Sequence, residues 1–386
     1  MRPGPGGRTL KTGPDAHKSG VPTDPSPIAA PPTPSSPPRP PLPICDEALA
    51  PLTALRQGLV TPGAAVPDPA PIVALVREID RRLGRSDADV IATALATGTD
   101  DAGRVQVLGR IDGSILAWLR AALKTAGESS EAAERASAWA TAECLFGLIA
   151  PTLSPALGDE DLGDGIARNF ARGRDALDGP ADAQARVLYP AYEAIEKRIF
   201  TAIHRVLLAD VSAAKGGDPL ALVRARGLFP LLRDRLQDRN TPGIAILEAA
   251  LAGPPAALDP AVFTREFGVA FAKRARKYCS EVVTDEALRG TPKGLASVTE
   301  GMTYTRLLLP DMHARVGAKG FDGATYMANW ESLLQAVDHG EDADELRRLS
   351  DDLVHWNCAY QEALGIAECT STHDEAAAKP AKPTKR

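Results

Sequence analysis

Apolar residues recur at intervals of three and four positions through almost all of the segment from Cys45 to Cys369. That spacing places them on one face of an α-helix, whereas a half-buried strand needs alternation at every second position. The segment GRVQVLGRIDG, residues 103–113, is a candidate for a short extended pair, but its helical surroundings favour a helix. The periodicity therefore predicts an all-α protein. It is clearest in one stripe near the C-terminal end: Leu346, Leu349, Leu353, Trp356, Tyr360 and Leu364.

The predicted helices number roughly ten to twelve and form two contiguous helical bundles. The best boundary is the breaker-rich segment GPPAALDP, residues 253–260. It separates an N-terminal bundle, residues 45–252, from a C-terminal bundle, residues 259–369. The longest periodic segment, residues 189–214, has a wide apolar face and is expected to be central. Aromatic residues make up only 5% of the chain, and the abundant alanine and leucine are inexpensive to place in helices.

Both ends of the chain lack this pattern. Residues 1–44 contain 14 of the 33 prolines, a composition typical of a disordered tail that favours extended structure. Within it, PPRPPLP has the form of a ligand for SH3-like domains, so a protein partner bound through this Pro-rich tail is the alternative to a merely disordered arm. Residues 370–386 are predicted to form a second disordered tail.

The charge distribution bears on the partners. The tails carry net charges of +3 and +2, so the formal net charge of −6 leaves −11 for residues 45–369. An acidic body repels phosphate backbones, which argues against nucleic-acid binding. The sequence contains no run of about 18 apolar residues, so no membrane span is predicted. The oligomeric state is not indicated by any pattern.

The start of the chain is polar and proline-rich and shows no apolar region typical of a signal peptide, so the expected location is cytoplasmic. An exported or periplasmic location is the alternative if the start site is misassigned. The five cysteines include no CxxC pair, which argues against a zinc knuckle or a thioredoxin-type motif. Scattered cysteines in a large chain are expected to be reduced and buried. A Cys358–Cys369 disulfide remains possible in an exported protein.

The stretch EGMTYTRLLLPDMH, residues 300–313, gathers several polar groups around a proline. Pro310 lacks an N–H for the carbonyl of Arg306, so the helix is expected to kink or end there. Asp311 and His313 would then lie in the first turn of a short following segment. We interpret this stretch as part of the fold and not as a binding site: the leucines pack in the core, and the polar side chains stabilise the helix ends. The alternative is a polar pocket at the kink, lined by Glu300, Tyr304 and His313.

The predicted central helix carries Glu193, Glu196 and His204. A di-iron bundle requires Glu-x-x-His motifs, whereas His204 follows Glu196 by eight positions, about 12 Å along the helix axis. His204 is therefore expected to border the core with its ring hydrogen-bonded. Glu143 lies in a predicted apolar helix. We expect it to pair with an arginine; the alternative is a buried carboxyl group with a raised pKa. His355 stands three positions after Asp352, a spacing that favours a half-exposed hydrogen bond.

The basic cluster Lys273, Arg274, Arg276 and Lys277 is expected to be solvated. Motifs for phosphate loops, dinucleotide binding, GxSxG nucleophiles and HExxH zinc sites are absent. The sequence thus predicts an all-helical binding or scaffold protein, soluble and non-catalytic, without a cofactor. The alternative is a helical-bundle metal-binding protein or metalloenzyme of the iron or zinc class. Its transition-metal ligands would come from Glu143, Glu193, Glu196, His204, Glu300, Asp311, His313 and His355.

Overall fold

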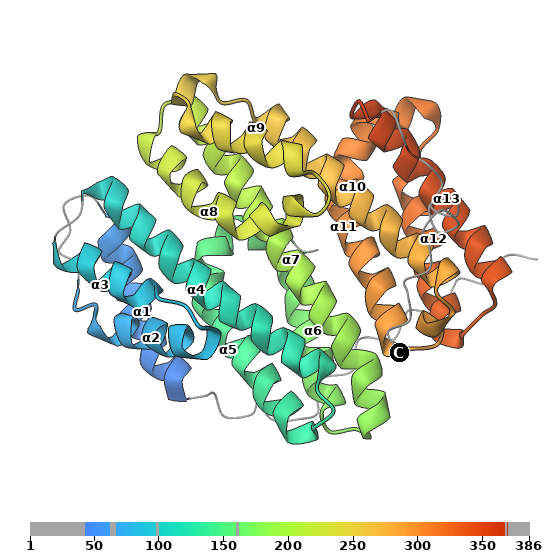
Figure 1. Cartoon of the computed structure of the whole chain (residues 1–386), viewed down its shortest axis with the longest axis horizontal. Helices are drawn as coiled ribbons and strands as arrows, with labels where there is room; N and C mark the ends of the chain where they lie inside the picture. The colour runs from blue at the N-terminus through green and yellow to red at the C-terminus, as the bar shows by residue number, and fades with distance from the viewer. Residues whose placement is uncertain (1–42, 62–66, 98–99, 160–161, 367–368, 370–386) are drawn as a thin grey trace, which may run out of the picture. The chain divides into compact units, whose positions relative to one another are not determined.

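The computed structural model describes residues 43–61, 67–97, 100–159, 162–366 and 369 (Figure 1). In this part of the chain there are thirteen α-helices, three short 3-10 helices and no strands. The all-α prediction is confirmed, and the helices slightly exceed the predicted ten to twelve. The two predicted tails lie outside the described residues, apart from the last two positions of the first tail.

Nine α-helices precede the predicted boundary. They are α1 (Pro43–Val60), α2 (Ala70–Leu83), α3 (Asp87–Ala96), α4 (Asp101–Glu128), α5 (Ala132–Leu157), α6 (Gly163–Ala176), α7 (Ala181–Lys215), α8 (Pro219–Gln237) and α9 (Thr241–Ala252). Within this group, α4 packs against α5, α7 and α8. The segment GRVQVLGRIDG belongs to α4, so its assignment to a helix is correct.

The predicted boundary itself holds the 3-10 helix η1 (Pro255–Ala257). After it come α10 (Pro260–Thr284), η2 (Glu286–Leu288), α11 (Pro292–Val316), η3 (Gly317–Lys319), α12 (Gly323–His339) and α13 (Ala343–Ala363). Helix α10 packs against α11 and α13, and α12 packs against both of those helices. Side chains cap several helices: Asp259 accepts a hydrogen bond from the backbone of Ala261, and Thr291 accepts one from Gly294.

Helix α7 is the longest of the described helices, and it touches helices on both sides of the boundary. It packs against α4, α5, α6 and α8, and also against α10 and α11 (Figure 1). Every residue from 191 to 204 is buried. The prediction that this segment is central is therefore confirmed, and Phe200 has no exposed surface. Whether the chain also divides into two bundles stays a prediction.

Pro310 does not act as the sequence suggests. Helix α11 continues through Pro310 to Val316, so the expectation of a helix end there is wrong. Helix α5 likewise continues through Pro151. A proline inside a helix removes one hydrogen bond and costs about 3 kcal/mol. In α11 the side chains of Leu308, Met312 and Val316 are buried on both sides of the exposed Pro310, and their burial offsets that cost.

Among the described helices, α5 is long and apolar enough to cross a membrane by length and composition alone. The core helix of a soluble protein passes the same test. Here α5 packs against α1, α4, α6 and α7, and its Trp139 is buried against Phe170 of α6, with ring centroids 5.6 Å apart. The helix therefore has protein neighbours on one side, and 33% of its apolar window is buried.

Candidate functional site

Three of the candidate carboxylates meet around one buried amine. Lys197 of α7 is only 3% exposed, and its ammonium forms ion pairs with Glu193 and Glu196 on the same helix. It also lies 3.1 Å from Oε1 of Glu300, which comes from α11. A buried charge is tolerated only when it is paired. Lys197 thus joins Glu300 to the two acids of α7, a meeting that the sequence does not indicate.

A second layer of cations completes this group. Glu196 Oε1 accepts a hydrogen bond of 2.8 Å from Nε of Arg120, on α4, and one of 3.3 Å from Nη2 of Arg235, on α8. Four helices therefore contribute side chains. We call these residues, three carboxylates and three cations, the Lys197 cluster: Arg120, Glu193, Glu196, Lys197, Arg235 and Glu300. Its formal charges cancel, which is the condition for burying so many of them.

The helical repeat of α7 explains how the cluster forms locally. Positions 193, 196, 197 and 200 follow the i, i+3, i+4, i+7 spacing that lies on one face of a helix. On this face Phe200 lies beneath both guanidinium groups, with Cζ of Arg235 4.0 Å and Cζ of Arg120 5.0 Å from the ring centroid. Cations bind favourably over an aromatic face. The ring therefore holds both arginines close to Glu196.

The charges of the cluster shift one another's protonation. Burial disfavours the charged form of Lys197, but the three glutamates outweigh it and raise its pKa well above the usual value. Burial also opposes ionisation of Glu196, yet Lys197 and the two arginines hold its pKa below the usual value. For Glu193 burial prevails over the attraction of Lys197 and raises the pKa to about 7. Glu193 is the member that can take up a proton near neutral pH.

Tyrosines surround the same carboxylates. Burial, followed by the charges of Glu193 and Glu196, raises the pKa of Tyr192. Burial and the charge of Glu300 likewise raise the pKa of Tyr278. Tyr304, one turn after Glu300, is 1% exposed and stacks on Phe271 at 5.1 Å. These phenols remain neutral near pH 7, so they add no charge to the cluster.

The cluster does not have the arrangement of a metal centre. The Lys197 ammonium occupies the space between the carboxylates, where a bridging cation would have to bind. In the described residues, no group of three or more histidine, cysteine, aspartate or glutamate side chains is arranged to hold a metal ion. What the arrangement does directly is to join α4, α7, α8 and α11 through ion pairs.

The remaining candidate residues lie elsewhere. Glu143 pairs with Arg174 of α6, which agrees with the expected arginine partner. Asp311 accepts hydrogen bonds from Arg315 at 2.7 Å and from the Tyr360 hydroxyl at 2.6 Å, so it ties α11 to α13. His313 and His355 are both exposed, so His355 is not half-exposed as expected, and Asp352 accepts a hydrogen bond from Asn329 instead. None of these residues contacts the Lys197 cluster.

His204 differs from its expected state. Its ring packs edge-on against Phe267 at 4.7 Å and Phe271 at 5.8 Å. The Nε2 atom is buried without a hydrogen-bond partner in the described part of the chain, so the expectation of a hydrogen-bonded ring is not met at that nitrogen. Burial, followed by the charge of Arg205, lowers the pKa of His204 to about 4, because the interior does not replace the hydration of its cation.

The basic cluster of α10 is also different from the prediction. Arg274 and Arg276 are buried rather than solvated. Nη2 of Arg274 lies 3.2 Å from Asp238, at the end of α8, and Arg276 donates a hydrogen bond of 2.7 Å to Sγ of Cys369. The two arginines are buried on different sides of α10: Arg274 points toward the end of α8, and Arg276 points toward the C-terminal segment. Lys273 and Lys277 are only partly buried.

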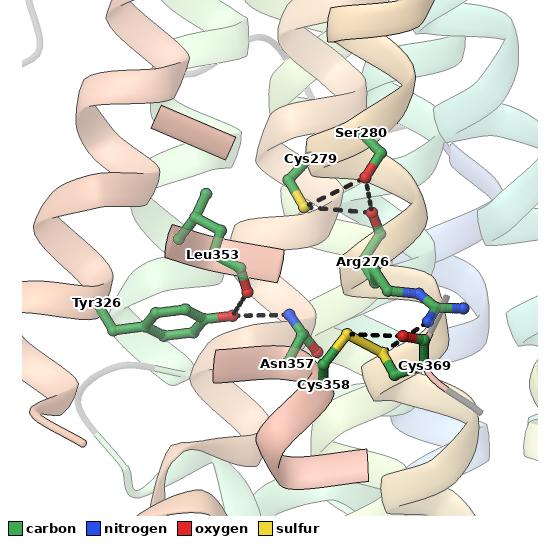
Figure 2. Close-up of a disulfide and its surroundings, with 8 residues drawn as sticks. All are labelled: Arg276, Cys279, Ser280, Tyr326, Leu353, Asn357, Cys358 and Cys369. Carbon is green, nitrogen blue, oxygen red and sulfur yellow. Dashed lines mark hydrogen bonds between the residues drawn. A yellow bond between two sulfur atoms is a disulfide. The ribbon is translucent and has the colours of Figure 1, made fainter. Parts of the chain in front are cut away.

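A disulfide joins Cys358 of α13 to Cys369 (Figure 2). Figure 2 shows it beside Arg276, with the hydrogen-bonded group of Tyr326, Leu353 and Asn357 nearby. Cys144 is disulfide-bonded as well, whereas Cys279 is a free, buried thiol. The expectation of reduced, buried cysteines therefore holds for Cys279 and is wrong for Cys144, Cys358 and Cys369, and the Cys358–Cys369 alternative is correct.

Two grooves open on the surface near α4. One lies between α4 and α8, has a volume of about 430 Å³ and is lined partly by Arg85, Arg110 and Arg226. The other lies between α4 and α5, measures about 440 Å³ and includes Trp118 and Glu134. The sequence pattern does not indicate either groove, because each depends on the packing of helices distant along the chain. The three arginines of the first groove, Arg85, Arg110 and Arg226, are far apart in the sequence and belong to no common motif.

Comparison with models of protein families, with curated proteins and with solved structures finds no match for this chain.

Proposed function

We propose that this chain is a non-catalytic, all-helical binding or scaffold protein. The observation that carries the proposal is the neutral, buried Lys197 cluster. It gathers six ionisable side chains, and each of its three carboxylates forms an ion pair with a cation of the cluster. A general acid or base must reach a substrate within hydrogen-bond distance. The cluster instead supports a rigid scaffold, and the grooves beside α4 supply concave surface for a ligand.

The competing function is a metal-binding protein, in which Glu193, Glu196 and Glu300 release Lys197 and bind a transition metal. Elemental analysis of untagged protein, before and after incubation with iron, zinc, copper and manganese, separates the two functions. The binding or scaffold function predicts substoichiometric metal in every sample. Stoichiometric metal that is lost in a Glu300→Gln variant would overturn the proposal and assign the metal to the cluster.

We also infer that the protein is exported to an oxidising compartment. The Cys358–Cys369 disulfide supports this inference, as does the second disulfide at Cys144, because thiols in the cytosol are kept reduced. In protein taken from its native cells without reductant, maleimide should label Cys279 after denaturation. It should label Cys144, Cys358 and Cys369 only after reduction. Labelling of all four without reductant would place the protein in a reducing compartment.

The two-bundle division and the Pro-rich tail belong to the same proposal. We infer a flexible boundary at residues 253–260, which predicts that limited proteolysis cleaves there before it cleaves within either bundle. The segment PPRPPLP is proposed to bind an SH3-like partner. Loss of partner capture on deletion of residues 1–42 tests that contact. Cleavage distributed evenly along the helices would contradict the boundary.

A further inference from the structure

The groove between α4 and α8 has a floor made of backbone. A Cβ added at Gly109 would lie 3.3 Å from Cα of Gly227, and one added at Gly113 would lie 3.2 Å from Cδ2 of Leu231. The two helices therefore approach closely because these positions carry no side chain. Beside this crossing the groove stays open, with a volume of about 430 Å³, which is in the range of small-molecule sites.

The walls of the groove carry an excess of positive charge. Arg85, Arg110 and Arg226 face it, and Asp87 is the acidic residue of the lining. Asp87 lies 2.6 Å from Arg85 and 3.7 Å from Arg110, so one carboxylate serves two guanidinium groups. Arg226 has no ion-pair partner in the described part of the chain, and its Nε donates to the carbonyl of Leu251 at 2.7 Å. The lining thus has two more positive than negative charges.

The N-terminus of a helix reinforces this positive potential. Helix α3 begins at Asp87, so its N-terminus, which carries a partial positive charge, is at the wall of the groove. A concave, low-dielectric surface of one sign concentrates ions of the opposite sign. Exposed Gln106 adds an amide that can bind an oxygen atom.

We propose that the α4–α8 groove binds a small anion that carries two or more phosphate or carboxylate charges. The guanidinium groups match the oxygen pairs of both groups with bidentate geometry. This inference rests on the proposed binding function and names its ligand class. An anion with two charges would neutralise the excess of the lining, whereas an uncharged ligand would leave the excess arginine charges uncompensated.

The test is calorimetric titration of the full chain with pyrophosphate and, separately, with citrate at constant ionic strength. We expect one saturable site for at least one of the two anions. Binding of pyrophosphate alone assigns phosphate, and binding of citrate alone assigns carboxylate. Arg110→Gln should weaken this binding about tenfold or more, the usual effect of losing a hydrogen bond to a charged group. The matched control is Arg347→Gln, at an exposed arginine of α13 that pairs with Asp344 at 3.2 Å; it should leave the affinity unchanged.

A second variant separates shape from charge. Gln106→Trp fills the groove without changing its charge and should also abolish binding, with an unaltered Tm. Absence of a saturable site for both anions overturns the inference, and so do equal losses in Arg110→Gln and Arg347→Gln. Either of these results leaves the binding or scaffold function standing, since the metal analysis decides that function separately.

Discussion

Lys197 of α7 and Glu300 of α11 form an ion pair in the core, with 3.1 Å between Nζ and Oε1, although they lie on opposite sides of the predicted bundle boundary. The pair is part of a cluster whose charges cancel only when α4, α7, α8 and α11 are all in place. A change at one member therefore leaves the others buried and unpaired, which makes the cluster sensitive to substitution.

Lys197→Met should destabilise the fold by about 3–5 kcal/mol, the cost of leaving buried charges without their partner. The free energy of unfolding in urea measures this effect. The matched control is Lys124→Met, at a lysine whose side chain is 63% exposed and 3.9 Å from Glu128; it should cost less than about 1 kcal/mol. Equal effects at the two lysines would contradict the structural role of the cluster.

The pKa of Glu193 predicts one component of the pH dependence of stability. Because its folded pKa is raised from 4.5 to about 7, folding favours proton uptake between these values. Its contribution to stability is therefore full below pH 4.5 and is lost as the pH rises through 7. Urea unfolding at a series of pH values should show this decline in the native chain and not in Glu193→Gln. The exposed residue Glu248 provides the control, since Glu248→Gln should follow the native curve.

His204 predicts a component of the opposite sign. Its folded pKa is lowered from 6.5 to about 4, so its contribution is full above pH 6.5 and is lost as the pH falls through 4. The loss amounts to about 3 kcal/mol, since each pKa unit corresponds to about 1.4 kcal/mol. His204→Phe should flatten the acid side of the stability profile, while His313→Gln, at an exposed site, should not. An unchanged profile in His204→Phe would mean that the ring is not buried as described.

Two helical glycines should respond in opposite directions to alanine. At Gly173 an added Cβ would lie 2.0 Å from Cζ2 of Trp139, whereas at Gly147 nothing lies within 4 Å. Gly173→Ala should therefore destabilise by about 1–3 kcal/mol through overpacking. Gly147→Ala should stabilise by about 0.5–1 kcal/mol through helix propensity. Thermal unfolding of both variants checks the prediction, and a stable Gly173→Ala protein would show that α5 and α6 do not pack as closely as described.

Removal of the Cys358–Cys369 disulfide should lower stability by up to about 3 kcal/mol, the value expected for a loop of this size. The double variant Cys358→Ser/Cys369→Ser avoids a reactive unpaired thiol. Its urea unfolding is compared with that of the native chain without reductant, so that the disulfide at Cys144 is intact in both. If the two proteins unfold at the same urea concentration, the bond does not constrain the fold.

Local periodicity predicted much of the architecture. The spacing of Leu346, Leu353 and Tyr360 indicated α13, and all three are buried. The wide apolar face around Phe200 indicated that α7 is central. Proline was misleading for the same local reason: its backbone cost is visible in the sequence, whereas the compensating burial of Leu308 and Met312 depends on other helices.

The candidate site was only partly predictable. Glu193 and Glu196 are three positions apart, so the sequence by itself determined that they share one face of a helix. The same spacing places Lys197 beside Glu193, but it could not determine that Glu300 meets them, because that requires α11 to pack against α7. Helix period is a property of the backbone and is encoded residue by residue. The pairing of buried charges is a property of packing, since each charge must find a partner on whichever helix lies against it, and only the tertiary structure decided which helix that is.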